Sequence, residues 1–407
     1  HAAIDEAHCV SEWGDSFRPA YLTLGNILKK LGIPLVTAFT ATASPEVLNR
    51  VSEILFDGNA HIVRSESDRQ NIHYNVVYSY AKDQKLLELV QEKERPVIIF
   101  CGTRNRAEQT ARLIREFFSV VLKSKVFDEK QNCCFHNAPE IVRFYHAGLS
   151  REEKKETEDW FFPKENAILC CTCAFGMGVD KKNVRTVIHR DVPLTAESFI
   201  QESGRGARDG GIANSFLLWN YDDYKKFSSF PHGSRQRVLL QFAQASDCRR
   251  QVLLDSLGAE QAACAGCDIC QSKGLINSPL SQSSLHGRMP ENLAKITFKK
   301  NPSLGLPSYG RSFGIFVPPD YKSAQDRNFA LRTLRFFSRS WSKEEACGFL
   351  QEKFNSISLA RFGVRTWQNS DIQEILNQLF DEQKIFLCRW PFKNKIAASK
   401  SRRKLTV

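Results

Sequence analysis

Short apolar runs alternate with helical patterns over the first 220 residues of the chain. The apolar runs are rich in β-branched residues, as buried strands are, and span 34–38, 96–100, 167–170, 184–189 and 215–218. Between them, apolar residues recur at helical spacing, for example over 107–118 and 151–162. This alternation predicts an α/β fold, with a parallel sheet that carries helices on both faces.

Residues 119–140 interrupt the alternation, and we expect them to form a surface insertion. Cys133, Cys134 and His136 lie in this segment. No second pair of residues follows at the spacing of metal ligands. An incidental cluster is therefore a simpler interpretation than a metal site.

The pattern changes again after residue 225. Residues 225–271 are predicted to be helical and end in a group of cysteines, whereas residues 272–322 are rich in Ser, Pro, Gly and Leu, as linkers are. Three helical patterns then precede a short strand and a turn with Pro391; the helices span 328–337, 343–354 and 371–380, and the strand 385–387. Three helices followed by strand, turn and strand predict a winged-helix domain.

The composition is that of a globular chain with a basic C-terminal third. A length of 407 residues predicts two to three domains. Residues 271–407 contain 23 basic and 10 acidic residues, so they account for the net charge of +12. Such a region favours a polyanion, either nucleic acid or an anionic membrane surface. No apolar run approaches the roughly 18 residues of a membrane span, and thirteen cysteines without an export signal fit a reducing cytoplasm.

The sequence Asp5-Glu6-Ala7-His8 follows what reads as the end of a buried strand. Asp at such a position can hold Mg²⁺ through the ion's water shell, and Glu can polarise a water that attacks a phosphate. Four residues recur often by chance, so alone they indicate a solvated turn more readily than a nucleotide site.

Four later motifs change this interpretation because they follow in a fixed order. They span residues 40–43, 145–149, 172–181 and 201–210. With the first motif, the set resembles superfamily 2 helicases, and the sequence DEAHCVSEWG over residues 5–14 resembles RecQ-type ATP-dependent DNA helicases. The resemblance is close over residues 1–271 and loose beyond them.

The resemblance implies RecA-like parallel-sheet lobes, the first of them incomplete, followed by a helical zinc-binding subdomain and a winged-helix domain. The expected segments are the end of the first lobe (1–68), the second lobe (69–222), the zinc subdomain (223–271), a linker (272–324), the winged helix (325–396) and a basic tail (397–407). The tail is either a phosphate-binding arm or a solvated end.

In enzymes of this family, ATP lies between the two lobes. The resemblance therefore assigns catalytic roles to Asp5, Glu6, His8, Gln201, Arg205 and Arg208. Asp5 would hold Mg²⁺ through water, and Glu6 would orient the attacking water. Arg205 and Arg208 would reach the triphosphate, since a guanidinium fork matches phosphate oxygens. We expect Arg208 to be the arginine finger.

Residues 11–19 resemble the aromatic-rich loop with which RecQ helicases sense single-stranded DNA. Trp13 and Phe17 would stack on bases and Arg18 would contact a phosphate; packing in the core is the alternative for the aromatics. Other DNA contacts are expected at Thr40, Thr42, Thr103, Arg104, His146, Thr172 and Gly176.

Two positions depart from the family pattern. Asp15-Ser16 stands where His-Asp is common, which puts the coupling of DNA binding to hydrolysis in doubt. Gly206-Ala207 stands where the family usually has Ala-Gly. Both neighbouring arginines keep their places, so we expect only a modest effect of the second change.

The cysteines of the helical segment form a metal-ligand pattern. Cys264, Cys267 and Cys270 are spaced C-x2-C-x2-C, and Cys248 precedes them on a helix. Four thiolates suit tetrahedral Zn²⁺, and the set matches the RecQ zinc motif. An iron–sulfur cluster is the chemical alternative. The site is expected to be structural and to supply folding free energy to its subdomain.

A helicase also needs a phosphate loop that ends in Gly-Lys-Ser/Thr, and the 407 residues contain none. We expect it upstream of His1, in a parent protein that is a 3′–5′ DNA helicase using ATP and Mg²⁺ in repair and recombination. The alternative is a truncated, non-catalytic DNA-binding protein; an RNA helicase is a third possibility. The expected partners are single-stranded and duplex DNA. The expected state is a cytoplasmic, nucleoid-associated monomer in a bacterium.

Overall fold

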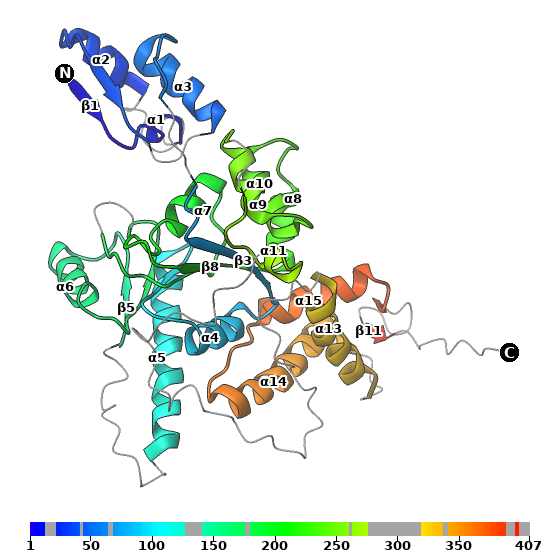
Figure 1. The fold of residues 1–407 in the computed structure, drawn as a ribbon. Coiled ribbons are helices and arrows are strands. Elements are labelled where there is room, and N and C mark those ends of the chain that lie inside the picture. The colour runs from blue at the N-terminus through cyan, green and yellow to red at the C-terminus, as the bar shows by residue number, and fades with distance from the viewer. Residues whose placement is uncertain are drawn as a thin grey trace.

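A parallel six-stranded sheet forms the centre of the protein in the computed structural model (Figure 1). The structure describes residues 1–12, 22–40, 44–63, 68–126, 141–175, 180–259, 263–275, 319–336, 341–387 and 395–398. The central strands are β3 (Ile72–Tyr78), β4 (Val97–Phe100), β5 (Val142–Tyr145), β6 (Ile168–Cys171), β7 (Thr186–His189) and β8 (Ala213–Trp219). Their order is β3-β8-β7-β4-β6-β5, and every neighbouring pair is parallel, which confirms the predicted α/β class.

Helices cover both faces of this sheet, as predicted. They are α4 (Lys82–Glu92), α5 (Arg104–Val126), α6 (Arg151–Phe161) and α7 (Ala196–Ser203). Successive side chains of β4 point to opposite faces of the sheet, so this strand contributes to two cores. Val97 and Ile99 pack in one core with α4 and α5, whereas Ile98 and Phe100 pack in another core with Phe161 of α6.

Strand β3 and helix α5 of the central domain differ from the sequence prediction. Strand β3 was not among the predicted strands, although its sequence Ile72–Tyr78 is rich in β-branched and aromatic residues. Helix α5 was predicted to end near residue 118 but continues to Val126, because apolar residues such as Val121 still face the core. The expected insertion therefore begins later, and Cys133, Cys134 and His136 lie outside the described residues.

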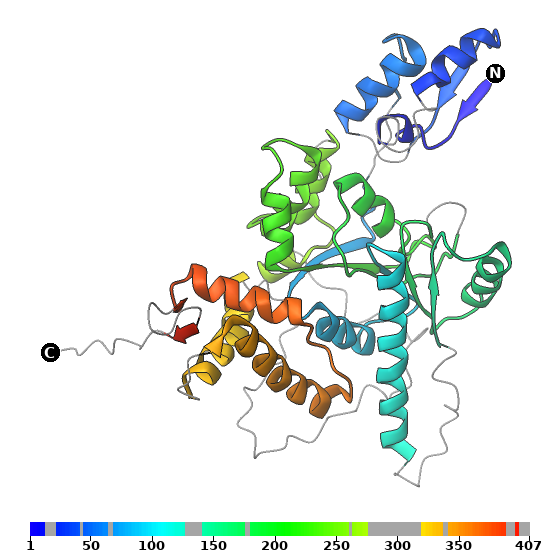
Figure 2. The ribbon, with the colours of Figure 1, turned by 180° about the vertical axis from the view of Figure 1, so that it is seen from behind.

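The N-terminal part is a small separate layer above α7 and α10 (Figures 1 and 2). It consists of parallel strands β1 (Ala2–Ile4) and β2 (Val36–Ala38) with helices α1 (Cys9–Glu12), α2 (Leu24–Lys30) and α3 (Pro45–Phe56). Its core contains Val10, Leu28, Val47 and Val51. Helix α3 begins after Ser44, whose Oγ accepts from the Val47 amide, and Pro45 suits the first helical position.

A helical region follows the large sheet, as predicted for residues 225–271. It comprises α8 (Tyr221–Ser228), the 3-10 helix η3 (Arg235–Arg237), α9 (Val238–Gln244), α10 (Arg249–Ser256) and α11 (Asp268–Ser272). Phe242 of α9 packs with Phe199 of α7 and Tyr74 of β3. Cys267 forms an isolated parallel β-bridge with Tyr74, so this region covers the outer edge of β3.

The C-terminal elements form three helices and a small antiparallel sheet. They are α13 (Pro319–Phe336), β9 (Trp341–Ser342), α14 (Lys343–Phe362), α15 (Asn369–Asp381), β10 (Ile385–Leu387) and β11 (Lys395–Ala398), with strand order β10-β11-β9. Helix α13 is longer than the predicted 328–337. The predicted helices and strand are present, and the winged-helix assignment itself stays a prediction.

This C-terminal unit packs against the central sheet's helices. The Trp367 indole donates to Gln84 of α4 at 2.9 Å, and Phe362 packs on Phe117 of α5. The Tyr221 hydroxyl donates to Asp381 at 3.1 Å. Among the described helices, none is both long enough and apolar enough to cross a bilayer.

Candidate functional site

The Asp5-Glu6 turn follows β1 at the edge where the two N-terminal parallel strands end. The Glu6 amide donates to Asp5 Oδ1 at 2.8 Å. Glu6 has a φ of 50°, which turns the chain sharply before α1. Asp5 is exposed and Glu6 is half-buried. Two carboxylates of different solvent access are thus presented at one edge.

The buried His8 ring joins this turn to the end of β2. Its Nδ1 lies 3.4 Å from Glu6 Oε2 and 3.2 Å from Thr40 Oγ1. Thr40 follows β2, and parallel strands end at the same edge, so the fold places it beside the earlier motif. The structure therefore brings Glu6, His8 and Thr40 together.

Gln201 connects the N-terminal layer with the central sheet's helices. It lies on α7, which begins after Thr195, whose hydroxyl accepts from the Ser198 amide at 3.2 Å. The Gln201 amide Nε2 donates to Glu6 Oε2 at 3.5 Å, the outer limit of a hydrogen bond. The carboxylate after β1 thus faces α7.

Arg205 and Arg208 lie on the loop that follows α7. Burial and the neighbouring Arg208 lower the pKa of the half-buried Arg205, whereas the charge of Glu6 opposes that change. Arg208 is more exposed, and its Nη1 pairs with Asp180 Oδ1 at 2.9 Å. That hydrogen bond lowers the pKa of the Asp180 carboxyl. One loop therefore carries two cations, and the charge of Glu6 acts on the pKa of one of them, Arg205.

The backbone between these arginines is tightly constrained. Ala207 has a φ of 44°, which is in the left-handed region. A Cβ atom on Gly206 would lie 2.7 Å from the Ala213 Cβ of β8. Gly206 is therefore required by close packing, whereas the left-handed conformation at the next position is one that glycine adopts more easily. The departure Gly206-Ala207 is thus accommodated at the cost of strain at Ala207.

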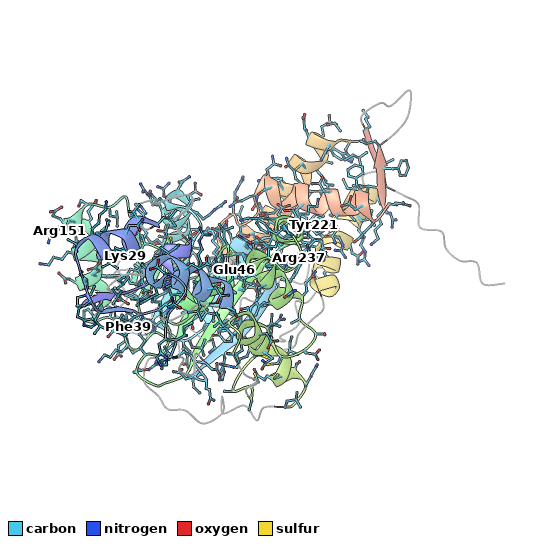
Figure 3. All side chains as sticks on the ribbon, turned by 90° about the horizontal axis from the view of Figure 1, so that it is seen from above. Lys29, Phe39, Glu46, Arg151, Tyr221 and Arg237 are labelled. Atoms are coloured by element: carbon cyan, nitrogen blue, oxygen red, sulfur yellow. The ribbon has the colours of Figure 1, made fainter. Side chains whose placement is uncertain are left out.

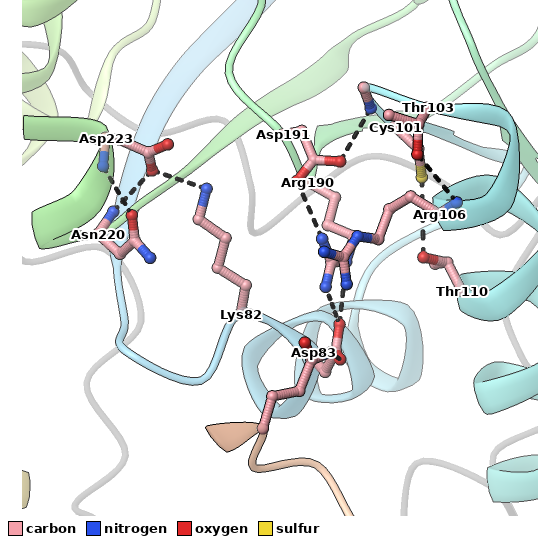
Figure 4. A network of polar contacts seen from close by, with 12 residues as sticks. Lys82, Asp83, Cys101, Thr103, Arg106, Thr110, Arg190, Asp191, Asn220 and Asp223 are labelled. Carbon is pink, nitrogen blue, oxygen red and sulfur yellow. Dashed lines mark hydrogen bonds and ion pairs between the residues drawn. The ribbon is translucent and has the colours of Figure 1, made fainter. Parts of the chain in front are cut away.

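The turn between β4 and α5 carries Thr103 and Arg104, which are both exposed. Thr103 Oγ1 accepts from the Arg106 amide at 3.2 Å and so caps α5. The Gly102 amide donates to Asp191 Oδ2 at 2.8 Å. Figure 4 shows that Arg190 pairs with Asp191 and, on its other side, with Asp83 of α4. Charged groups from the segment after β7 and from α4 thus fix this turn.

His146 and Thr172 follow β5 and β6 at the same edge of the sheet, but they are buried. His146 Nε2 lies 3.0 Å from Glu108 Oε1 of α5, and its ring stacks on Phe144. The Thr172 amide donates to the Tyr145 carbonyl at 3.2 Å. Thr103 and Arg104 are thus predicted DNA contacts that are exposed, whereas His146 and Thr172 are predicted DNA contacts that are buried.

Five other predicted DNA-binding residues lie outside the described part of the chain. They are Trp13, Phe17, Arg18, Thr42 and Gly176. Their roles stay predictions from the sequence.

The four cysteines of the predicted metal site converge on one point. The Sγ atoms of Cys248, Cys264, Cys267 and Cys270 all lie within 4.8 Å of one another. Bonds of about 2.3 Å to a tetrahedral Zn²⁺ require sulfur separations of about 3.8 Å, so small side-chain movements would suffice. Hydrogen bonds with Cys248 and Cys264, and then with the Cys270 amide, lower the pKa of the Cys267 thiol, whereas hydrogen bonds with Cys248 and Cys267 raise the pKa of the Cys264 thiol. The donor set fits Zn²⁺.

Two buried arginines beside this cluster were not assigned a role from the sequence. Arg249 Nε donates to Asp268 Oδ1 at 2.6 Å, and Asp268 Oδ2 accepts from the Val76 amide of β3 at 3.1 Å. Arg250 donates to the carboxylate of Asp68 and to the Arg69 carbonyl. Consecutive arginines next to a ligand cysteine were the available signal. They attach the cysteine region to the edge strand.

Comparisons with known proteins agree with these motifs. The family model described as "Helicase conserved C-terminal domain" matches residues 81–210. The chain is 31% identical over 302 residues to "ATP-dependent DNA helicase RecQ" of Pasteurella multocida (strain Pm70), covering 70% of this chain and 44% of that protein. It is 39% identical over 225 residues to "Probable ATP-dependent DNA helicase RecS" of Bacillus subtilis (strain 168), covering 54% and 41%. The chain thus spans less than half the length of either relative.

A solved structure gives a weaker likeness. "Structure of Mycobacterium smegmatis helicase Lhr bound to ssDNA and AMP-PNP" is 19% identical with a TM-score of 0.42, covering 61% of this chain and 31% of that one. A likeness of this size adds nothing to the family assignment.

Proposed function

Because the chain belongs to the RecQ family of superfamily 2 helicases, we propose that its protein is an ATP-dependent DNA helicase that moves 3′ to 5′ and acts in repair and recombination. One observation carries the proposal. The carboxylate of Glu6 lies 3.5 Å from Gln201 on α7, on the side of the molecule where Arg205 is found. A carboxylate of the N-terminal layer thus contacts the helix that leads to Arg205, and its charge acts on that arginine, which supports nucleotide hydrolysis between two lobes.

In this proposal, each acidic and imidazole group of the β1 turn has a separate role. The exposed Asp5 holds Mg²⁺ through water, in keeping with that ion's preference for oxygen ligands. Glu6 orients the attacking water, and its contact with Gln201 fixes the carboxylate. The His8 ring contacts both Glu6 and Thr40, and so links the carboxylate to a predicted DNA contact. The bound Mg²⁺ neutralises charge on the phosphates.

The two arginines supply the positive charge for the triphosphate. Arg205 already lies near Glu6. Arg208, the expected finger, must leave Asp180 to reach a phosphate. That ion pair is partly exposed, with side chains 33% and 58% exposed, so solvent screens it and the pair is weak. Closure of the lobes around ATP therefore releases Arg208 at little cost.

DNA binding is proposed at the edge of the large sheet. Thr103 and Arg104 are exposed there, on a turn that is held rigidly by Asp191. A hydroxyl and a guanidinium on a fixed turn are suited to the phosphates of one strand. Zn²⁺, held by the four cysteines, would stabilise the helical region that covers β3.

The alternative function is DNA binding without catalysis, through the zinc and winged-helix modules. In a winged helix, the third helix commonly enters the major groove. Here that helix is α15, and its residues Asn369–Asp381 include no Lys or Arg. Its Glu374 is buried against α8, where it accepts from the Tyr221 amide at 2.6 Å. This arrangement favours the helicase over a DNA reader that relies on α15.

The test is hydrolysis and unwinding by the polypeptide isolated from its source cell. We expect peptides that carry a Gly-Lys-Ser/Thr loop, and ATP hydrolysis that rises with single-stranded DNA. Glu6→Gln should reduce that hydrolysis by about 10²- to 10⁴-fold. Glu46→Gln is the matched control, since Glu46 is exposed on α3 of the same layer (Figure 3). DNA binding without hydrolysis in the native polypeptide would favour the alternative.

Residues 1–407 alone should not hydrolyse ATP, because they contain no Gly-Lys-Ser/Thr loop, whose lysine binds the nucleotide phosphates. DNA-stimulated turnover by this chain that disappears on Glu6→Gln would overturn that expectation.

A further inference from the structure

The loop with the two arginines is held by a segment that carries none of the predicted site residues. This segment, residues 68–72, leads into β3. Two of its side chains, Arg69 and Asn71, point at the backbone of residues 204–211. Neither belongs to a motif that the sequence singled out, and their contacts with the arginine loop span more than 130 positions of the chain.

Arg69 binds three backbone carbonyls of the loop. Its Nη2 donates to the Gly206 and Ala207 carbonyls, both at 3.0 Å. Its Nη1 donates to the Gly204 carbonyl at 3.4 Å. A guanidinium has five N–H donors in a fixed plane, so one side chain can bind carbonyls on both sides of Arg205. The backbone of that arginine is thereby held at two flanking peptide groups.

Asn71 completes the contact. Its Nδ2 donates to the Ala207 carbonyl at 2.8 Å and to the Gly211 carbonyl at 2.7 Å. Its Oδ1 accepts from Arg69 Nε at 3.2 Å, which fixes the two side chains relative to each other. The Ala207 carbonyl therefore accepts from both residues. Arg208 lies between the two carbonyls that Asn71 binds.

The contacts explain why a strained residue persists in this loop. Ala207 has a left-handed φ of 44° and is fully buried. Such a conformation is unfavourable for a residue with a Cβ atom and is maintained only when surrounding contacts determine it. Four side-chain hydrogen bonds to the Gly206, Ala207 and Gly211 carbonyls provide that constraint.

The holding segment is itself fixed from the opposite side. Arg250, which follows Cys248 by two positions, donates to the Arg69 carbonyl at 3.1 Å and to the Ile72 carbonyl at 2.5 Å. Arg250 is almost fully buried. Residues 68–72 are thus attached to the cysteine region on one side and to the arginine loop on the other.

We propose that Arg69 and Asn71 are positioning residues for the arginine loop: they hold its backbone so that Arg205 and Arg208 are oriented toward the nucleotide. The inference rests on the proposed function, since it needs these arginines to act on ATP. Neither Arg69 nor Asn71 touches the nucleotide. Their effect is on the transition state, because a guanidinium displaced by about 1 Å stabilises developing charge poorly.

The first test needs no activity. Hydrogen exchange is measured on the amides of residues 204–211 in the full chain. Asn71→Ala should raise their exchange rate at least tenfold, whereas Asn75→Ala should not. Asn75 is the matched control, because it is an asparagine of the adjoining strand β3 whose Nδ2 also donates to backbone carbonyls, those of His73 and Ser215. Equal exchange in both variants would overturn the proposal.

The second test measures ATP hydrolysis by the native, hydrolysing polypeptide. Asn71→Ala and Arg69→Lys should lower kcat roughly ten- to a hundredfold and leave the KM for ATP within about twofold. A lysine keeps the charge but cannot bind three carbonyls. Loss through KM alone, or wild-type kcat despite faster exchange, would refute a positioning role.

The two proposals fail in different ways. If Arg205→Lys and Arg208→Lys leave hydrolysis unchanged, the proposed function of the loop is wrong. If those variants lower kcat and the Asn71 variant does not, the arginines act as proposed and the positioning inference is wrong.

Discussion

The Glu6 carboxylate accepts from the Gln201 amide at 3.5 Å, although 195 positions separate the two residues. Glu6 lies in the turn that follows a short strand of the N-terminal layer, and Gln201 lies in the helix that leads to the arginine loop. A change in the distance between the layers therefore acts directly on the proposed general base.

Gln201→Glu tests that relationship. A second carboxylate at this position would repel Glu6, and like charges so close raise the pKa of one of the pair by about 1–3 units. The acidic limb of the pH profile for kcat should therefore move to higher pH, whereas Gln201→Ala should lower kcat without that movement. Hydrolysis measured across pH in the native polypeptide distinguishes the two. An unmoved limb in Gln201→Glu would show that the groups do not interact during turnover.

Removing one cysteine tests the metal site. Cys267→Ser should lose the bound zinc and unfold the helical region, because the metal supplies folding free energy. Metal content by elemental analysis and helix content by circular dichroism report the two effects. Cys173→Ser is the control, since Cys173 is exposed and lies outside the cluster. Iron with a visible absorption band in the purified chain would mean an iron–sulfur cluster instead.

Gly206→Ala should destabilise the central domain by about 1–3 kcal/mol, since overpacking forces neighbouring atoms apart. The new Cβ would lie 2.7 Å from that of Ala213. Ala213→Gly in the same chain removes the clash and should restore most of the loss. Urea unfolding of the single and double variants measures this coupling. Equal stability of Gly206→Ala and wild type would mean that the loop has room that the structure does not show.

The interface of the C-terminal unit should weaken as pH rises. Burial raises the pKa of Asp371 to about 7 and that of Glu374 to about 9, with Asp222 adding to the second effect. A carboxyl with a raised pKa in the folded state stabilises below its unfolded pKa, and this contribution is lost as pH rises through the folded value. The melting temperature should therefore fall from about pH 4, near the unfolded pKa of a carboxyl, to about pH 9, and above about pH 7 the fall is due to Glu374.

Glu374→Gln isolates the second carboxyl. The amide oxygen can still accept from the Tyr221 amide, but the side chain no longer ionises. The fall in melting temperature above about pH 7 should become smaller in this variant. A pH dependence identical to that of the wild type would assign the effect to other groups.

DNA binding by the chain should depend strongly on salt. The basic excess lies in residues 271–407, and each phosphate neutralised releases a counterion, so the logarithm of the association constant falls linearly with the logarithm of the salt concentration. Fluorescence anisotropy with a labelled oligothymidylate measures the slope. The same affinity at low and high salt would exclude electrostatic binding by this region.

The sequence by itself determined the α/β class, the order of the motifs and the four cysteines that converge on one point. Each of these depends on short-range patterns: β-branched runs such as 184–189, the acidic pair Asp5-Glu6, and the C-x2-C-x2-C spacing that ends at Cys270. Such patterns reflect local geometry, because strands alternate side chains between faces and one turn can supply several thiolates. They need no knowledge of distant neighbours.

Tertiary structure decided which residues meet. The contacts of Gln201 with Glu6 and of Asn71 with Ala207 join positions more than 100 residues apart. Arg69 and Arg250 were assigned no role from the sequence, yet Arg250 is almost fully buried and both bind backbone carbonyls. Their roles depend on where the segment before β3 passes between the cysteine region and the arginine loop. Chain folding alone creates that placement, since no local propensity encodes a partner so far along the sequence.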